Sequence, residues 1–180
     1  MLDLAELPYC EACALSRTRT RVVVGSGPRL PGLVVVGEAP GRHEDEGGEP
    51  FVGRSGQLLV RLIREELGLE RSQYFITNVV KCRPPKNRTP RAVEVAACRP
   101  WLDAQLEHLG PSAILAVGNV AARAVFGYTQ GISATHGRVS HREGVPGVAT
   151  YHPAAALRAG PNVVDVMRAD LRVLRSLGSE

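Results

Sequence analysis

Residues 33–56 read LVVVGEAPGRHEDEGGEPFVGRSG, and this stretch sets the pattern from which the rest of the chain is interpreted. The apolar run at 33–36 predicts a short buried strand. It ends at a glycine-rich turn, GEAPG at 37–41, where glycine lets the backbone turn tightly and approach a ligand. Glu38 lies in this turn and Phe51 follows it. A carboxylate-bearing turn at the carboxyl end of a strand, with an aromatic ring nearby, predicts a pocket for a flat polar molecule.

Apolar runs and helical patterns alternate along the chain. The expected strands are 33–37, 75–80, 113–118 and 148–151. Residues at helical spacing predict helices at 57–67, 91–109, 120–126 and 163–177. Strands that alternate with helices favour βαβ units. We therefore expect an α/β fold with a mostly parallel sheet and helices on both of its faces.

Each expected strand leads directly into a distinctive turn. The second strand carries Asn78 into its turn, the third ends at Gly-Asn 118–119, and the fourth ends at His152. The carboxyl ends of parallel strands meet at one edge of a sheet, where open α/β sheets bind ligands. We therefore expect Glu38, Asn78 and His152 to line one crevice, although they are far apart in the sequence.

The composition is that of an ordinary globular protein. The chain has 180 residues, of which 44% are hydrophobic and 22% charged, and this length suits a single domain over residues 1–180. No apolar run is long enough to cross a membrane. The N-terminal sequence MLDLAELPYC lacks the basic start and apolar stretch of a secretory signal. We therefore expect a cytoplasmic protein that does not use structural disulfides.

Positive charge is concentrated in two stretches. The formal net charge is +4 and the sequence pI is about 9.1. Residues 81–91, KCRPPKNRTPR, hold five basic side chains and no acid, and residues 16–30 hold four arginines and no acid. This distribution favours a nucleic acid as partner. For either stretch alone, a solvated face that keeps the protein in solution is the favoured interpretation.

The four cysteines form the second distinctive pattern. Cys10 and Cys13 make a C-x2-C pair, and Cys82 and Cys98 lie far downstream, separated by fifteen residues. Four thiolates fit a four-sulfur metal site, holding either zinc or an iron–sulfur cluster. Such a site would tie the N-terminal segment to the sheet. The alternative is four unrelated cysteines that pack in the interior.

Taken together, these motifs resemble the family 4 uracil-DNA glycosylases, the iron–sulfur type. The matching stretches follow the order of that family over nearly the whole chain, and they are C-x2-C at 10–13, GEAPG at 37–41, EDEGGEPFVGRSGQLL at 44–59, YFITNVVKCRPPKNRTP at 74–90, ACRPWL at 97–102 and HPAAALR at 152–158. The resemblance implies a three-layer α/β/α fold with a central four-stranded, mostly parallel sheet. It also implies removal of uracil from DNA, which leaves an abasic site and begins base excision repair.

The resemblance implies a [4Fe–4S] cluster as cofactor. Its ligands would be Cys10, Cys13, Cys82 and Cys98. Hydrolysis of an N-glycosidic bond needs no electrons, so we expect the cluster to be structural.

The resemblance also gives roles to three residues of the expected crevice. A glycosylase takes the base out of the stack before it breaks the bond. Phe51 would stack on the flipped uracil. Asn78 would accept from N3–H and donate to O4, a pattern that cytosine reverses. His152 would donate to O2, where negative charge develops as the base leaves. Their ordinary structural alternatives are a core aromatic, a strand-end cap and a packed histidine.

The acidic turn supplies the remaining expected contacts. Gly37, Glu38 and Ala39 would line the base, and Glu38 or Glu44 would stabilise the cation-like sugar or position water. Family 1 enzymes carry a catalytic aspartate where this chain has Ala39, which leaves the activator of water open. They also carry a tyrosine that blocks the methyl group of thymine, where this chain has Gly41. We hypothesise that Glu44 takes over this exclusion.

The remaining expected contacts are to the DNA backbone and the base stack. Leu157 would wedge into the gap left by the base and Arg158 would pair with a phosphate, although the same segment also suits an ordinary helix start. The expected phosphate contacts of the basic stretch are Lys81, Arg83, Lys86 and Arg88. We expect salt-sensitive DNA binding that weakens when Lys86 and Arg88 are changed together.

The leading hypothesis is a monomeric, monofunctional glycosylase that acts on uracil in single- or double-stranded DNA. One alternative is a relative that captures uracil in DNA without turnover. A covalently binding offshoot of the superfamily carries an inserted basic loop between the TN motif and the fourth cysteine, and this chain lacks it. The other alternative is a non-catalytic zinc or iron–sulfur module.

Overall fold

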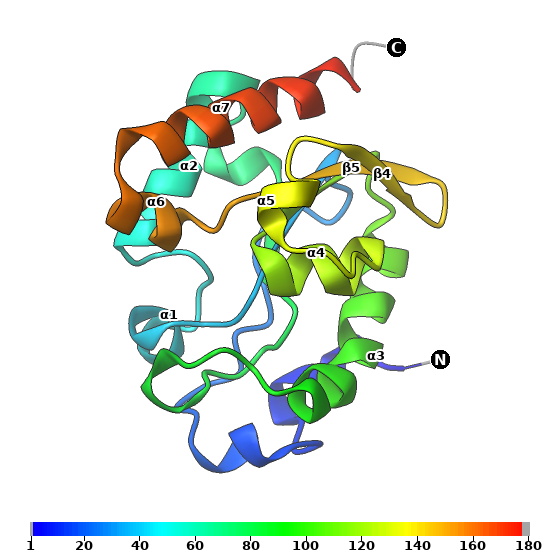
Figure 1. Ribbon diagram of the computed structural model, residues 1–180. Helices are drawn as coiled ribbons and strands as arrows, with labels where there is room; N and C mark the ends of the chain where they lie inside the picture. The colour runs from blue at the N-terminus through cyan, green and yellow to red at the C-terminus, as the bar shows by residue number, and fades with distance from the viewer. Residues whose placement is uncertain (1, 178–180) are drawn as a thin grey trace.

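The computed structural model describes residues 2–177, which form a five-stranded sheet between two layers of helices (Figure 1). The strand order is β2-β1-β3-β5-β4. The strands are β1 (Leu33–Gly37), β2 (Phe75–Asn78), β3 (Ala113–Val117), β4 (Val139–Arg142) and β5 (Val145–Thr150). All neighbouring pairs are parallel except β4 with β5. The expected α/β class is confirmed.

The helices cover both faces of this sheet. They are α1 (Arg42–Gly47), α2 (Arg54–Leu67), α3 (Ala92–Leu109), α4 (Asn119–Phe126), α5 (Ile132–Thr135), α6 (Pro153–Ala159) and α7 (Pro161–Ser176). Short 3₁₀ turns occur at η1 (Leu4–Tyr9), η2 (Ala14–Arg17), η3 (Arg71–Gln73) and η4 (Pro85–Asn87). Helices α3 and α4 and the N-terminal segment pack on one face, and α2, α6 and α7 pack on the other.

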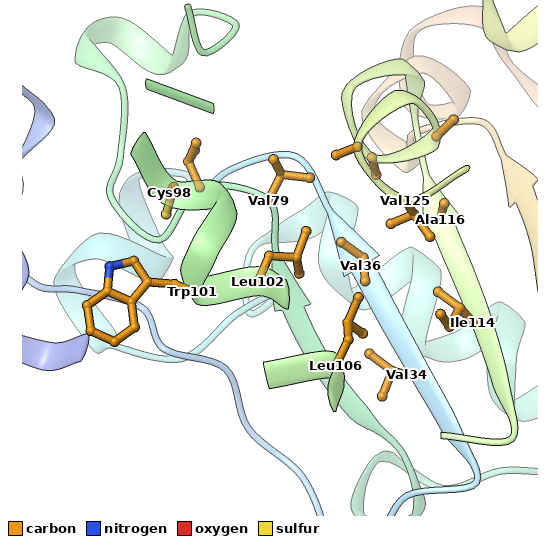
Figure 2. Close-up of a cluster of buried hydrophobic side chains, with 14 of the residues drawn as sticks. Val34, Val36, Val79, Cys98, Trp101, Leu102, Leu106, Ile114, Ala116 and Val125 are labelled. Carbon is orange, nitrogen blue, oxygen red and sulfur yellow. The ribbon is translucent and has the colours of Figure 1, made fainter. Parts of the chain in front are cut away.

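Alternation along the strands divides the core into two layers. Val34 and Val36 of β1 point to the α3 side, whereas Val35 points to the α2 and α7 side. Figure 2 shows Leu102 and Leu106 of α3 projecting toward the β1 valines. A parallel strand covered on both faces is apolar at every position, which explains the continuous apolar run of β1.

The expected four strands are all present, but the sheet has a fifth, β4, and the expectation of four was wrong. This edge strand reads VSHR, and its one apolar residue, Val139, is exposed, so no hydrophobic pattern marks it. It forms a hairpin with β5 through Glu143 and Gly144, both of which have positive φ (50° and 86°). Two central residues with positive φ are the geometry that suits a tight hairpin.

Strand β2 ends at Asn78, two residues earlier than the apolar pattern predicts. The amide N–H groups of Val79 and Val80 donate to the carbonyl oxygens of Gly37 and Glu38 (2.8 and 3.1 Å). The chain is therefore drawn across the end of β1, and Asn78 lies beside Gly37 at the carboxyl edge of the sheet.

Within residues 2–177, none of the helices combines the length and the apolar character that crossing a membrane requires.

Candidate active site

The strand-end turns meet around a cavity of about 470 Å³ at the carboxyl edge of the sheet. Glu38 follows β1, Asn78 ends β2 and His152 follows β5, and all three line this cavity as the sequence predicts. The other lining residues come from the segment between β1 and α2, which includes α1, from the start of α2, from the basic loop and from α6. They are Ala39, Pro40, Gly41, Glu44, Phe51, Ser55, Pro84, Asn87, Arg88, Thr89, Ala154 and Arg158.

Phe51 is held in an unusual backbone conformation beside the cavity. Its φ is 59°, a region that non-glycine residues rarely occupy, and its ring is 9% exposed. Gly37 and Gly56 permit this placement, because a Cβ on Gly37 would collide with the Phe51 ring and one on Gly56 would collide with the Phe51 backbone. The Phe51 and His152 rings lie 6.4 Å apart between centroids. The ring therefore forms a fixed wall of the cavity.

Asn78 carries a buried acceptor that the protein does not use. The residue is 2% exposed, and its Oδ1 has no hydrogen-bond partner among the residues described. A buried polar atom without a partner costs about 1–3 kcal/mol, so such atoms are rare in folded proteins. A Cβ on Gly37 would collide with this oxygen, so glycine is required there as well. The cavity thus presents an acceptor that a ligand N–H can satisfy.

His152 presents its ring to the cavity as the N-cap of α6. Its Nδ1 accepts a hydrogen bond from the Ala154 amide (3.2 Å). Burial, reinforced by the charge of Arg158, lowers the pKa of His152 to about 4. The ring is therefore neutral near pH 7. Because Nδ1 is an acceptor, the proton lies on Nε2.

The two acidic candidates differ in their environment. Both carboxylate oxygens of Glu44 accept backbone N–H groups, from Gly41 (3.0 Å) and from Gly53 (2.8 Å). A Cβ added to Gly41 would meet Glu44 Oε2 at 2.7 Å, so this carboxylate fills the space of a side chain at position 41. Glu38 is half-buried, and burial raises its pKa. Glu44 therefore fixes the shape of the loop through its backbone hydrogen bonds, whereas the Glu38 carboxylate does not hold the loop in this way.

One residue of the basic loop is not where the sequence analysis places it. Lys81 is 1% exposed, and burial lowers its pKa to about 8. Its ammonium cannot reach a DNA phosphate, so the expected contact is wrong. Lysine at the end of a basic stretch is normally solvated, and only the packing of α3 over β2 shows otherwise.

The other basic side chains of the loop remain accessible to different degrees. Lys86 is exposed. Arg83 donates to Asn87 Oδ1 (2.7 Å). Arg88 lines the cavity, but both of its terminal nitrogens donate to Glu94 (2.8 and 2.6 Å). A phosphate would therefore compete with Glu94 for the Arg88 guanidinium.

Helix α6 contains the two residues that the sequence analysis expects to enter the base stack and to contact a phosphate. Leu157 is 46% exposed, and Arg158 lines the cavity one residue later. The segment 153–159 is also an ordinary helix with proline in its first turn, so the two interpretations of this segment are compatible.

All four cysteines line one small second cavity behind the basic loop. None of them forms a disulfide. N–H donors approach the sulfurs, among them Trp101 Nε1 on Cys10 Sγ (3.1 Å) and Arg19 on Cys82 Sγ (3.5 Å). Donors of this kind stabilise thiolates that serve as metal ligands.

The cysteines are gathered, but they are not arranged around a single ion. In the part of the chain that the structure describes, no three cysteine, histidine or acidic side chains are placed to hold one metal ion. A tetrahedral zinc site would bring its sulfurs to roughly 3.8 Å from one another, from a Zn–S distance of about 2.3 Å. A polynuclear cluster holds its sulfur ligands farther apart, and the donor set of four thiolates fits that kind of group.

Three polar residues of the cavity were not singled out from the sequence, namely Ser55, Asn87 and Thr89. Asn87 has a φ of 54° and follows two prolines and a lysine. Asparagine close to prolines is typical of a turn, so the sequence is consistent with a loop at this position. It does not show that the Asn87 side chain faces the cavity.

Comparison with known proteins agrees with this geometry. The family model described as "Uracil DNA glycosylase superfamily" matches residues 24–172, and the chain therefore belongs to that superfamily. It is 41% identical over 181 residues to a type-4 uracil-DNA glycosylase of Sulfurisphaera tokodaii, covering 96% of this chain and 81% of the relative. It is 45% identical over 156 residues to the type-4 enzyme of Thermotoga maritima, covering 85% and 80%. A type-5 enzyme of Pyrobaculum aerophilum is 37% identical over 138 residues, covering 68% and 61%. These relatives place the chain in the type-4 branch.

Proposed function

We propose that this protein is a uracil-DNA glycosylase that takes uracil out of DNA and hydrolyses its N-glycosidic bond, leaving an abasic site for base excision repair. The observation that carries the proposal is the buried, unpartnered Asn78 Oδ1 in a cavity that it shares with a neutral imidazole and an aromatic wall. The names of the type-4 relatives support the same activity.

Asn78 selects the base. Uracil offers a donor at N3–H and an acceptor at O4, and the amide of Asn78 supplies the complementary pair. Cytosine offers an acceptor at N3 and a donor at the neighbouring amino group, which leaves both groups of the amide unpaired. Each unpaired buried group costs about 1–3 kcal/mol, so two of them give discrimination of several orders of magnitude.

His152 stabilises the leaving base. Its Nε2–H is free to donate, because Nδ1 is engaged by the Ala154 amide. Negative charge grows on uracil O2 as the bond breaks, so a donor aimed at that atom acts more strongly in the transition state than in the ground state. The neutral ring needs no proton from solvent to perform this task. Phe51 meanwhile supplies a flat surface for the face of the base.

Glu38 is the acid best suited to the sugar side of the reaction. The sugar becomes cation-like as the base departs, and a nearby carboxylate stabilises it or orients the attacking water. Glu44 has both oxygens engaged by the loop backbone, so it acts as a positioning residue and as the side chain that excludes the methyl group of thymine.

The four cysteines would hold a [4Fe–4S] cluster. The observations in support are the shared cavity of Cys10, Cys13, Cys82 and Cys98 and the N–H donors on the sulfurs of Cys10 and Cys82. When bound, this group would cross-link the N-terminal segment to the loop that follows β2 and to α3. The residues of the base cavity perform the hydrolysis without it.

The DNA would lie across the mouth of the cavity. Leu157 would enter the base stack, and Arg158, Lys86 and Arg83 would contact the backbone, with Arg88 joining when it leaves Glu94. The exposed face of α6 and the basic loop border the same cavity from two sides. A monomer contains all of these groups, and we propose that the protein acts as one in the cytoplasm.

The test is cleavage of oligonucleotides that carry one uracil, single-stranded and paired, followed by alkali. Matched oligonucleotides with cytosine or thymine at the same position serve as controls. We expect strand breaks only with uracil, and loss of more than about 100-fold in Asn78→Ala. Retention of uracil-DNA on the protein without base release would favour the capture function, and neither binding nor release would refute both.

A further inference from the structure

Lys81 is a fully buried ammonium that neither base recognition nor DNA binding uses. Its Nζ lies 2.7 Å from Thr77 Oγ1, 2.6 Å from the Asn78 carbonyl oxygen and 2.6 Å from Gln105 Oε1. In the part of the chain that the structure describes, it has no carboxylate partner within ion-pair distance. Lys81 also lines the cysteine cavity, and its charge interacts with the Cys98 sulfur. Its hydrogen-bond acceptors are nevertheless three neutral oxygens, and burying a charge among them is costly, so its presence calls for a specific task.

Two of the three oxygens, Thr77 Oγ1 and Gln105 Oε1, belong to side chains that are themselves held by further hydrogen bonds. Gln105 Nε2 donates to the Val24 carbonyl (2.7 Å), and Thr77 Oγ1 donates to the same carbonyl (3.0 Å). These bonds join α3, β2 and the segment that precedes β1. The position of Nζ is therefore set from three sides. An ammonium is the one side-chain group with three donors on a single atom, which matches three converging oxygens.

One of those oxygens belongs to the residue that reads the base. The Asn78 peptide lies where β2 leaves the sheet, and its carbonyl accepts Nζ on one side while its side chain lines the cavity on the other. Oδ1 of that side chain is left without a partner, an arrangement that would relax if the peptide could rotate.

We propose that Lys81 is a positioning residue for Asn78, and this inference rests on the proposed function. The ammonium fixes the Asn78 peptide so that the side-chain amide of Asn78 stays aimed at the base. The hydrogen bonds of Lys81 offset the free-energy cost of leaving Oδ1 without a partner. A group misplaced by about 1 Å can lower a rate about 100-fold, so the effect of losing this bond is measurable.

The test is a double-mutant cycle between Lys81→Met and Asn78→Ala, measured under single-turnover conditions on a uracil oligonucleotide. Methionine keeps the length of the side chain and removes its donors. We expect Lys81→Met to lower the rate about 10- to 100-fold in the wild-type background, and less than about threefold once Asn78 is alanine. The preference for uracil over cytosine should fall with the rate.

Equal losses in both backgrounds would show that Lys81 only supports the fold, and an unchanged rate would show that it has no role. Met167→Ala is the control, because Met167 is fully buried on the opposite face of the sheet. It should lower the unfolding temperature and leave the preference for uracil intact. Iron content is measured for every variant, so that damage to the cysteine site is not mistaken for loss of positioning.

If Lys81→Met does not fold, Gln105→Met answers the same question. It removes one of the three acceptors of Lys81 Nζ, which is then held by the remaining two, Thr77 Oγ1 and the Asn78 carbonyl oxygen. Its loss of rate should be smaller and should again disappear in the Asn78→Ala background. A wild-type protein that fails to release uracil refutes the proposed function, whereas an active wild type with additive losses refutes only the role of Lys81.

Discussion

Replacing His152 by asparagine separates two tasks that the structure assigns to one ring. The ring caps α6 through Nδ1 and offers Nε2–H to the base. Asparagine is among the best N-cap residues, and its Oδ1 can accept the Ala154 amide in place of Nδ1. It has nothing that reaches as far as Nε2. We therefore expect a folded protein whose glycosylase rate falls about 100- to 1,000-fold, the usual cost of one missing oxyanion donor.

The same variant should change how stability depends on pH. The pKa of His152 is about 4 in the folded protein, against an ordinary value of 6.5. Between these values the unfolded chain binds the extra proton, so acidification favours unfolding and stability is highest above pH 6.5. This difference in pKa corresponds to a loss of about 2.5 kcal/mol on going from pH 7.5 to 4.5. Asparagine does not titrate, so the variant should lack this part of the loss.

The assay is urea unfolding of both proteins at pH 7.5 and 4.5. Other acidic and basic groups titrate alike in the two proteins, so the difference between their pH dependences isolates His152. His141→Asn, at an exposed position on β4, is the matched control for the same substitution made away from the cavity, and it should leave the glycosylase rate unchanged. Identical pH dependences for wild type and His152→Asn would refute the buried, neutral imidazole, and an undiminished rate would refute its role as donor.

Three further predictions concern the loops around the cavity. Glu44→Ala leaves the backbone N–H of Gly53 without its acceptor, so we expect the free energy of unfolding in urea to fall by about 1–3 kcal/mol. The variant should also release thymine measurably, and unchanged rejection of thymine contradicts the exclusion role. Lys86→Met should lower the slope of log affinity for DNA against log salt by about 0.9, and an unaltered slope in a binding titration means that Lys86 does not contact phosphate. Arg88→Met should lower the urea midpoint, because buried Glu94 then keeps, among the residues described, only the Arg91 amide as a hydrogen-bond partner, and an unchanged midpoint would contradict this ion pair. Its salt slope should change less than that of Lys86→Met.

The amino-acid sequence by itself determined the four parallel strands, the main helices between them and the residues that meet at the carboxyl edge. The run before Glu38 is apolar at every position because β1 is covered on both faces, and such a run is visible without coordinates. The parallel arrangement then follows from the alternation of elements. It brings Glu38, Asn78 and His152 together with no further information.

Only the tertiary structure decided what each of these groups is bonded to. Lys81 and Lys86 belong to one basic stretch, yet one lies under α3 and the other lies in solvent. Glu44 is one of several acids in its turn, but it alone folds back onto Gly41 and Gly53. Hydrogen-bond partners depend on the directions of side chains from distant elements, and local sequence patterns carry no information on those directions. The edge strand β4 buries little apolar surface, so no hydrophobic pattern marks it in the sequence.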